Sequence, residues 1–164
     1  MEKLLENEIA LRLLSLRVQT IADALLVTTD RHFVLGRMAD RDDVVNRLKG
    51  EYHVPGTGVS DASEKDIPSA LRLYLASALW LQPELLDVIG VSYREPDDRF
   101  VRHIHYWGRI NLTANEAEKE ARPGLDLSHV VIVTGCKAVE LIASSKVAFE
   151  RTPKVFQTMF NSRD

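Results

Sequence analysis

The sequence predicts an α/β fold, with helices on both faces of a mixed central sheet. Strand-like apolar runs alternate with segments of helical period, in the order helix, strand, strand, helix, strand, strand, strand, helix. The 164 residues are 45% hydrophobic and 27% charged, which suits a globular chain with a buried core. We therefore expect one domain over residues 1–164, with residues 1–15 as an N-terminal helix.

The first part of the chain predicts this helix, then a β-hairpin and a short strand. Apolar residues at helical spacing, with charged residues between them, indicate the helix, and Asp30-Arg31 indicates the hairpin turn. In the next turn Gly56 and Gly58 allow positive φ or the close approach of another group. These elements cover residues 1–15, 20–28, 32–37 and 52–58.

A second helix is expected up to about Leu81. Ser63 or Asp66 is placed to cap it, and Pro68 is tolerated in its first turn because the missing N–H has no helical partner there. Apolar residues extend around most of its circumference, which is typical of a buried helix. We expect this helix to be enclosed.

The remaining sequence predicts two paired strands, a charged segment, a short buried strand and one or two closing helices. The second paired strand alternates, so His103 and His105 should point to one face. In order, these segments are residues 85–93, 99–111, 116–122, 130–134, 139–143 and 155–160, with a turn at residues 95–98.

Charge and cysteine content exclude several classes. The net charge is −3 and no dense Lys/Arg block is present, which argues against a broad nucleic-acid surface. Cys136 is the only cysteine, so no intramolecular disulfide forms. The N-terminus lacks a secretory signal pattern, and no apolar run reaches the ~18 residues of a membrane span. We expect a cytoplasmic protein.

The segment around Gly58 resembles the Nudix box. Glu64 follows Gly58 after five intervening residues, and Arg72 follows Glu64 after seven. The Nudix box has this spacing and continues as Arg-Glu-x-x-Glu-Glu. Residues 33–37, Phe-Val-Leu-Gly-Arg, also resemble the Nudix Leu-x-Gly-Arg segment. The resemblance spans roughly residues 21–160 and implies the Nudix α/β/α sandwich with a mixed central sheet.

The second half of the box lacks its acids, because Leu73, Ala76 and Ser77 occupy positions of the Nudix glutamates. Mg²⁺ binds carboxylate oxygens, which leucine and alanine do not supply. In Nudix hydrolases those glutamates hold the metals that polarise a diphosphate and activate water. Glu64 and Arg72 do not rebuild that site. We predict a Nudix fold without standard diphosphate hydrolase activity and without a metal or other cofactor.

A divergent hydrolase is the alternative. It would cleave a nucleoside diphosphate linked to another group, would require Mg²⁺, and would use Glu64 as its catalytic carboxylate. Acids from polar loops would have to replace the missing glutamates, although solvated loops commonly carry such acids without a role. The candidates are Asp61, Asp66, Glu95, Asp97, Asp98, Glu116, Glu118 and Glu120.

Two groups of residues are candidates for binding an anion. The amides of Gly56, Thr57 and Gly58 would meet a phosphate, although glycines that only shape a turn show the same pattern. Arg37 and Arg72 carry the planar guanidinium that suits phosphate or carboxylate.

His103, His105 and Trp107 form a third candidate group on one strand face. Two imidazoles suit a transition metal, but the local sequence offers no third ligand. These side chains would instead line a cavity, with hydrogen bonds from imidazole and a stacking surface from indole, or form a half-buried sheet face.

The sequence therefore favours a module that binds a nucleotide derivative or another small molecule, or a subunit that binds a protein partner. The small and apolar residues Leu73, Ala76 and Ser77 would pack against that ligand or partner. A purely structural homodimer component is a further alternative.

Overall fold

The computed structural model describes residues 19–42, 48–59, 62–94 and 101–162. The expected helix at residues 1–15 and the expected turn at residues 95–98 lie outside these ranges.

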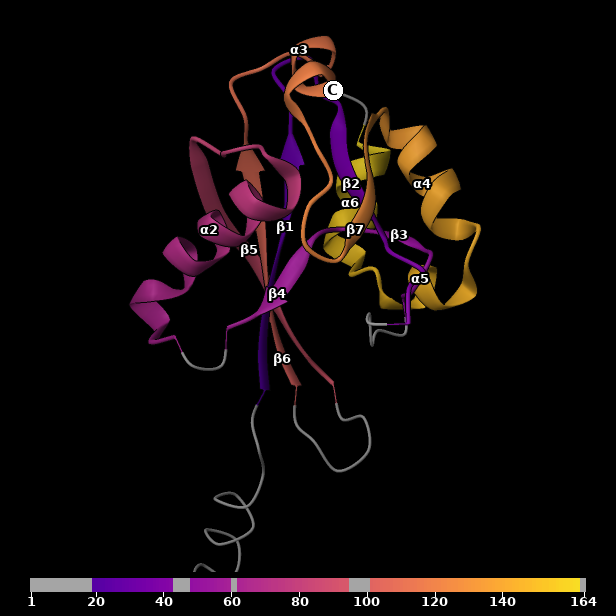
Figure 1. Cartoon of the computed structure of the whole chain (residues 1–164). Coiled ribbons are helices and arrows are strands. Elements are labelled where there is room, and N and C mark those ends of the chain that lie inside the picture. The colour runs from indigo at the N-terminus through magenta and orange to yellow at the C-terminus, as the bar shows by residue number, and fades with distance from the viewer. Residues whose placement is uncertain (1–18, 43–47, 60–61, 95–100, 163–164) are drawn as a thin grey trace, which may run out of the picture.

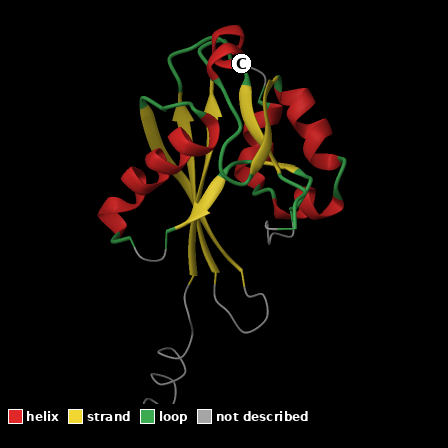
Figure 2. Cartoon of the chain, in the orientation of Figure 1, coloured by secondary structure: helices red, strands yellow, loops and turns green. Residues whose placement is uncertain are grey.

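Helices lie on both sides of a central sheet (Figure 1). The helix α2 (Ile67–Leu79) covers one face, whereas α4 (Gly135–Ala143), α5 (Lys146–Arg151) and α6 (Lys154–Asn161) gather on the other. Figure 2 shows the same three layers by secondary structure. The predicted α/β sandwich is confirmed.

The strand β1 (Gln19–Val27) is the centre of the sheet. It pairs in parallel with β6 (Val101–Arg109) and antiparallel with β2 (Phe33–Met38) and β4 (Gly56–Gly58), so the sheet is mixed, as predicted. The strand order is β3-β2-β1-β6-β5, and β7 pairs with β2. These outer strands are β3 (Tyr52–His53), β5 (Leu85–Arg94) and β7 (Leu127–Val133).

Side chains of β1 contribute to the hydrophobic cores on both faces of the sheet, because successive side chains of a strand point to opposite faces. Ala22, Ala24 and Leu26 pack with the buried face of α2. Leu25 points the other way and packs with Phe156 of α6 and its neighbours. A single buried strand therefore anchors the helices of both layers.

The helix α2 buries one face only. A short 3₁₀ turn, η1 (Glu64–Asp66), precedes it, and its last residue is followed by Trp80 in the left-handed conformation. Leu73 is 71% exposed and Trp80 is 65% exposed. The expectation of a helix buried nearly all round was therefore wrong, because the sheet touches only one side of it.

Two other expectations are corrected. The charged segment contains a helix, α3 (Ala114–Glu120), which starts with a capping box between Thr113 and Glu116. Between residues 135 and 161 the structure has three helices rather than one or two. Thr134 and Ser145 accept hydrogen bonds from the first turns of α4 and α5. No helix in the described ranges has the length and apolar character needed to cross a bilayer.

Candidate functional site

A cleft opens where the sheet meets the joint between α5 and α6. It consists of two adjoining cavities, of about 290 Å³ and about 740 Å³, which share His103 and residues 151–153. Strands β1 and β4 contribute to the first cavity, and strands β5 and β6 to the second. Pockets of this size that combine apolar walls with a few polar groups are typical ligand sites.

Three polar side chains from three strands form a hydrogen-bonded chain in this cleft. Nδ1 of His105 lies 2.8 Å from Oδ1 of Asp23, and Nε2 of His105 lies 2.8 Å from Oγ of Ser92. His105 is 2% exposed, whereas Ser92 is exposed. The chain therefore runs from a buried carboxyl group to a hydroxyl group at the surface of the second cavity.

The environment of Asp23 opposes ionisation and His105 favours it. Burial raises the pKa of Asp23 above its ordinary value of 3.8, while the hydrogen bond and positive charge of His105 act to lower it. An ionised carboxylate only accepts hydrogen bonds, so with Asp23 ionised Nδ1 carries the proton and Nε2 of neutral His105 accepts from the Ser92 hydroxyl.

Two further histidines line the cleft. The ring of His103 stacks on the ring of His105, with centroids 5.9 Å apart. His53 is buried in the first cavity, and this burial lowers its pKa below the ordinary 6.5. The edge contact between His105 and Phe156, with ring centroids 5.4 Å apart, holds the central imidazole against α6.

Gly56, Thr57 and Gly58 line the first cavity. A Cβ at Gly56 would lie 2.7 Å from Cβ of Asp23, so glycine is needed there for β4 to approach β1. Neither glycine has positive φ. The antiparallel pairing, with the amide N–H of Val59 donating to the carbonyl of Thr20, makes Gly56 and Gly58 non-hydrogen-bonded positions. Their amides therefore face away from β1.

Arg37, Arg72 and Trp107 are not among the residues that line the two cavities. Nε of Arg37 donates to the carbonyl of Gly50 at 2.8 Å. The guanidinium of Arg72 donates to the carbonyls of Pro83 and Glu84. Trp107 lies on the same strand face as His103 and His105, opposite residues 25 and 87 of the neighbouring strands.

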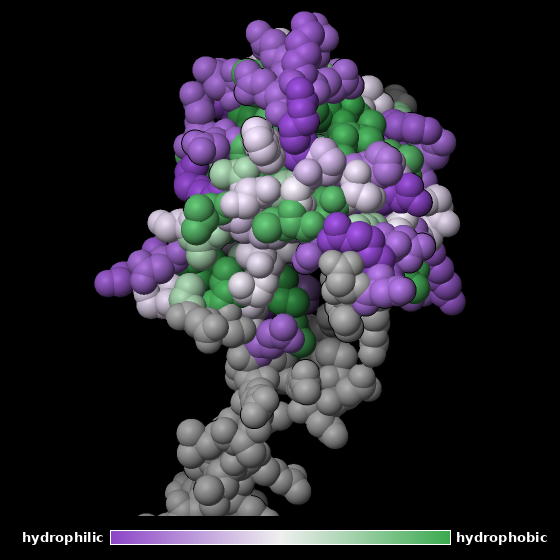
Figure 3. Space-filling view, viewed as in Figure 1, coloured by the Kyte–Doolittle hydropathy of each residue, from purple (hydrophilic) through white to green (hydrophobic). Residues whose placement is uncertain are grey.

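Two of the three α2 residues at the expected glutamate positions line a second, apolar groove on this helix. Ser77 and Leu73 line it together with Leu125, which is 55% exposed. The Ser77 hydroxyl donates to the carbonyl of Leu73 at 2.9 Å, so it is already used within the helix. Figure 3 shows apolar surface over α2 and the segment before β7.

The side chain of Glu64 is outside the described part of the structure, as are Asp61, Glu95, Asp97 and Asp98. Asp66 accepts a hydrogen bond from Ser63, and Glu116 belongs to the cap of α3. Glu118 and Glu120 are exposed on α3. Within the described ranges no group of three or more His, Cys, Asp or Glu residues is arranged to hold a metal ion.

Sequence reasoning missed Asp23, Ser92 and Arg151. The signal for Asp23 was present, since it is a charged residue inside an apolar strand, where a buried carboxyl group requires a partner. Ser92 and Arg151 carry no local signal. Strand pairing and the position of the α5–α6 joint bring them to the cleft.

No protein-family model and no curated protein matches the sequence. Solved structures do match the fold. The Nudix domain of Shewanella oneidensis NrtR, crystallised with ADP ribose, has a TM-score of 0.59 and 11% identity over 74% of this chain and 76% of its own. The MutT protein of Methanosarcina mazei Go1 has a TM-score of 0.58 and 15% identity over 89% of this chain and 92% of its own.

A C. elegans Ap4A hydrolase, in a binary complex, has a TM-score of 0.58 and 9% identity over 87% of this chain and 94% of its own. Identities this low establish the fold alone. With the sheet order and the two helical layers, these similarities show that the chain has a Nudix fold, a mixed α/β architecture around a mixed central sheet.

Proposed function

We propose that this Nudix-fold protein binds a nucleotide derivative or a related small anion in the cleft and does not hydrolyse a diphosphate by the metal-dependent route of the Nudix box. The observation that carries this proposal is the contrast between α2 and the cleft. At the box positions α2 presents Leu73 and Ser77 to an apolar groove, whereas the cleft holds Asp23, His103 and Arg151.

The first cavity offers chemistry suited to a phosphorylated ligand. Arg151 supplies a guanidinium group and His103 an imidazole. Gly56 and Gly58 line the same cavity, and their amides are not used in the pairing with β1. The NrtR Nudix domain was crystallised with ADP ribose, and this supports a ligand of that class here.

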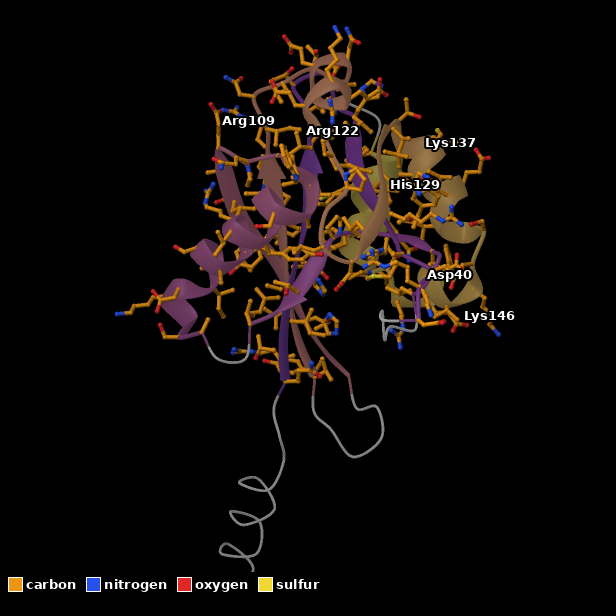
Figure 4. All side chains as sticks on the ribbon, viewed as in Figure 1. Asp40, Arg109, Arg122, His129, Lys137 and Lys146 are labelled. Carbon is orange, nitrogen blue, oxygen red and sulfur yellow. The ribbon has the colours of Figure 1, made fainter. Side chains whose placement is uncertain are left out.

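Thermal unfolding against nucleotides, nucleotide sugars and dinucleotides, each with and without Mg²⁺, tests this proposal. A ligand that binds only the folded protein raises its melting temperature. We expect a rise that does not require Mg²⁺ and that falls in Arg151→Gln. The control variant is Lys137→Gln, which removes a positive charge at an exposed position of α4 (Figure 4). The ligand should still raise the melting temperature of this variant.

The alternative is a divergent Mg²⁺-dependent hydrolase of a nucleoside diphosphate linked to another group. It predicts turnover that a chelator and Glu64→Gln both abolish. A partner-binding subunit or homodimer predicts no ligand response, and the mass of the protein in solution would reveal self-association.

A further inference from the structure

The chain Asp23, His105, Ser92 has the order of groups found in serine nucleophile sites: a carboxyl group, an imidazole and a hydroxyl group. Both hydrogen bonds are 2.8 Å long. The three residues come from β1, β6 and β5, so the sheet itself positions them. A nucleophile and base within about 2.6–3.2 Å, with the base oriented by a third group, is the geometric signature of an activated nucleophile.

The surroundings fit these roles. Buried Asp23 orients the imidazole through Nδ1, which leaves Nε2 to take the proton of the Ser92 hydroxyl. The rings of His103 and Phe156 hold the imidazole from two sides. Ser92, by contrast, is exposed and lines the larger cavity, where a substrate has access to its Oγ.

We propose that Ser92 is a nucleophile, His105 its general base and Asp23 the positioning residue of a site that hydrolyses a small carboxylic ester. Oγ of Ser92 attacks the ester carbonyl carbon while Nε2 of His105 takes the hydroxyl proton. The C–O bond to the alcohol then breaks, and His105 gives its proton to the leaving alcohol. Water, deprotonated by His105, attacks the acyl-serine, and the proton returns to Oγ as the acid leaves.

The same cavity contains groups that would stabilise negative charge. The first turn of α6 lines it with Lys154 and Val155, and the first amides of a helix have no acceptor within the helix. Arg151 and Lys154 add positive charge, and the carboxylate of Glu150 in the same lining is paired with Lys146 at 3.7 Å. Gly90 lies beside the base. A Cβ at this position would be 3.8 Å from Cδ2 of His105, so glycine leaves that space open.

Labelling of the full chain with an alkyl fluorophosphonate tests the nucleophile directly, with the modified residue identified by peptide mass. Ser128 is the internal control. Its Oγ also lies near a histidine, 3.0 Å from Nδ1 of His129, which is exposed on β7 (Figure 4). Ser128 itself is half-buried, and its hydroxyl also donates to the carbonyl of Arg37 at 3.4 Å. General-base activation is worth on the order of 100-fold or more, so Ser92 should react at least about 100-fold faster than Ser128.

Hydrolysis of p-nitrophenyl acetate provides the second measurement. Ser92→Ala changes an exposed residue of an edge strand, so we expect it to fold, to lose labelling at position 92 and to lose the hydrolysis. Ser128→Ala should retain both. His105→Gln should reduce both about 100-fold or more. Asp23→Asn, which favours the wrong imidazole tautomer, should slow labelling even where its melting temperature is unchanged.

Ser92 reacting no faster than Ser128 in the wild-type protein would overturn the proposal, and this comparison needs no variant to fold. Unchanged hydrolysis in Ser92→Ala would overturn it as well. Neither measurement involves a nucleotide, so the outcome is independent of ligand binding in the first cavity.

Discussion

Nδ1 of His105 lies 2.8 Å from Oδ1 of Asp23, although 82 positions separate the two residues in the sequence. The parallel pairing of β1 with β6 places them directly opposite each other. Both side chains are buried, so each provides a hydrogen-bond partner that the other needs in the protein interior.

A double-mutant cycle should measure this dependence. Asp23→Ala and His105→Ala each leave a buried polar partner, so we expect each to lower the free energy of unfolding by about 1–3 kcal/mol. The double variant should lose less than the sum, with a coupling of about 0.5–3 kcal/mol. Urea denaturation of the four proteins gives these values, and additive losses would contradict the contact.

His53 should make stability depend on pH. Burial lowers its pKa in the folded protein, so the unfolded chain binds a proton more readily. The stability that its neutral form contributes is complete above the ordinary pKa of 6.5 and is lost as the pH falls through the lower folded value. The free energy of unfolding should therefore fall below pH 6.5 more steeply in the wild type than in His53→Gln. His129→Gln controls for the loss of an exposed histidine.

Gly124 should not tolerate a side chain. A Cβ there would lie 2.3 Å from the backbone oxygen of Ser77, and the amide of Gly124 donates to the carbonyl of Ala78 at 2.9 Å. Gly124→Ala must push this segment away from α2, and we expect a loss of about 1–3 kcal/mol in urea denaturation. At Gly58 a Cβ meets nothing within 4 Å, so the same substitution there should cost far less.

Glutamates at the α2 positions that correspond to those of the Nudix box should create a response to Mg²⁺. The combination Leu73→Glu, Ala76→Glu and Ser77→Glu places carboxylates at i, i+3 and i+4 of α2, where side chains are neighbours. Leu73 and Ser77 are exposed, so the helix should tolerate the change. We expect Mg²⁺ to raise the melting temperature of this variant, and not that of the corresponding triple glutamine variant. A triple glutamate variant with no response would show that α2 alone does not supply such a site.

Arg72 should be important for stability. Its guanidinium donates to the carbonyls of Pro83 and Glu84, which connects α2 to the start of β5. Arg72→Ala should lower the free energy of unfolding by about 1–2 kcal/mol. Ligand-induced stabilisation, measured as the shift in melting temperature, would separate this role from ligand binding. If Arg72→Ala abolished the shift without changing stability, Arg72 would be a ligand-binding residue.

Local patterns were sufficient for the β1–β2 hairpin and failed where tertiary context decides, as at Gly56–Gly58, which was expected to be a turn and is strand β4. The apolar run of β1 and the turn at Asp30-Arg31 predicted the hairpin, because period-2 alternation and turn chemistry are properties of neighbouring residues. The helix α3 was not predicted, since its charged sequence has no apolar stripe, although Thr113 and Glu116 form its capping box. The burial of α2 was overestimated because periodicity does not reveal how much of a helix its neighbours cover.

The sequence by itself determined the order of the β1–β2 hairpin, α2 and the paired strands β5 and β6, the spacing from Gly58 to Arg72 that resembles the Nudix box, and the absence of acids at Leu73, Ala76 and Ser77. Only the tertiary structure decided that Asp23, His105 and Ser92 form one hydrogen-bonded chain and that Arg151 lines the adjoining cavities. The physical reason is the distance along the sequence over which each kind of interaction acts. Backbone propensity and alternation act over a few residues, whereas a cleft is formed by strand register and helix packing between segments far apart in the chain.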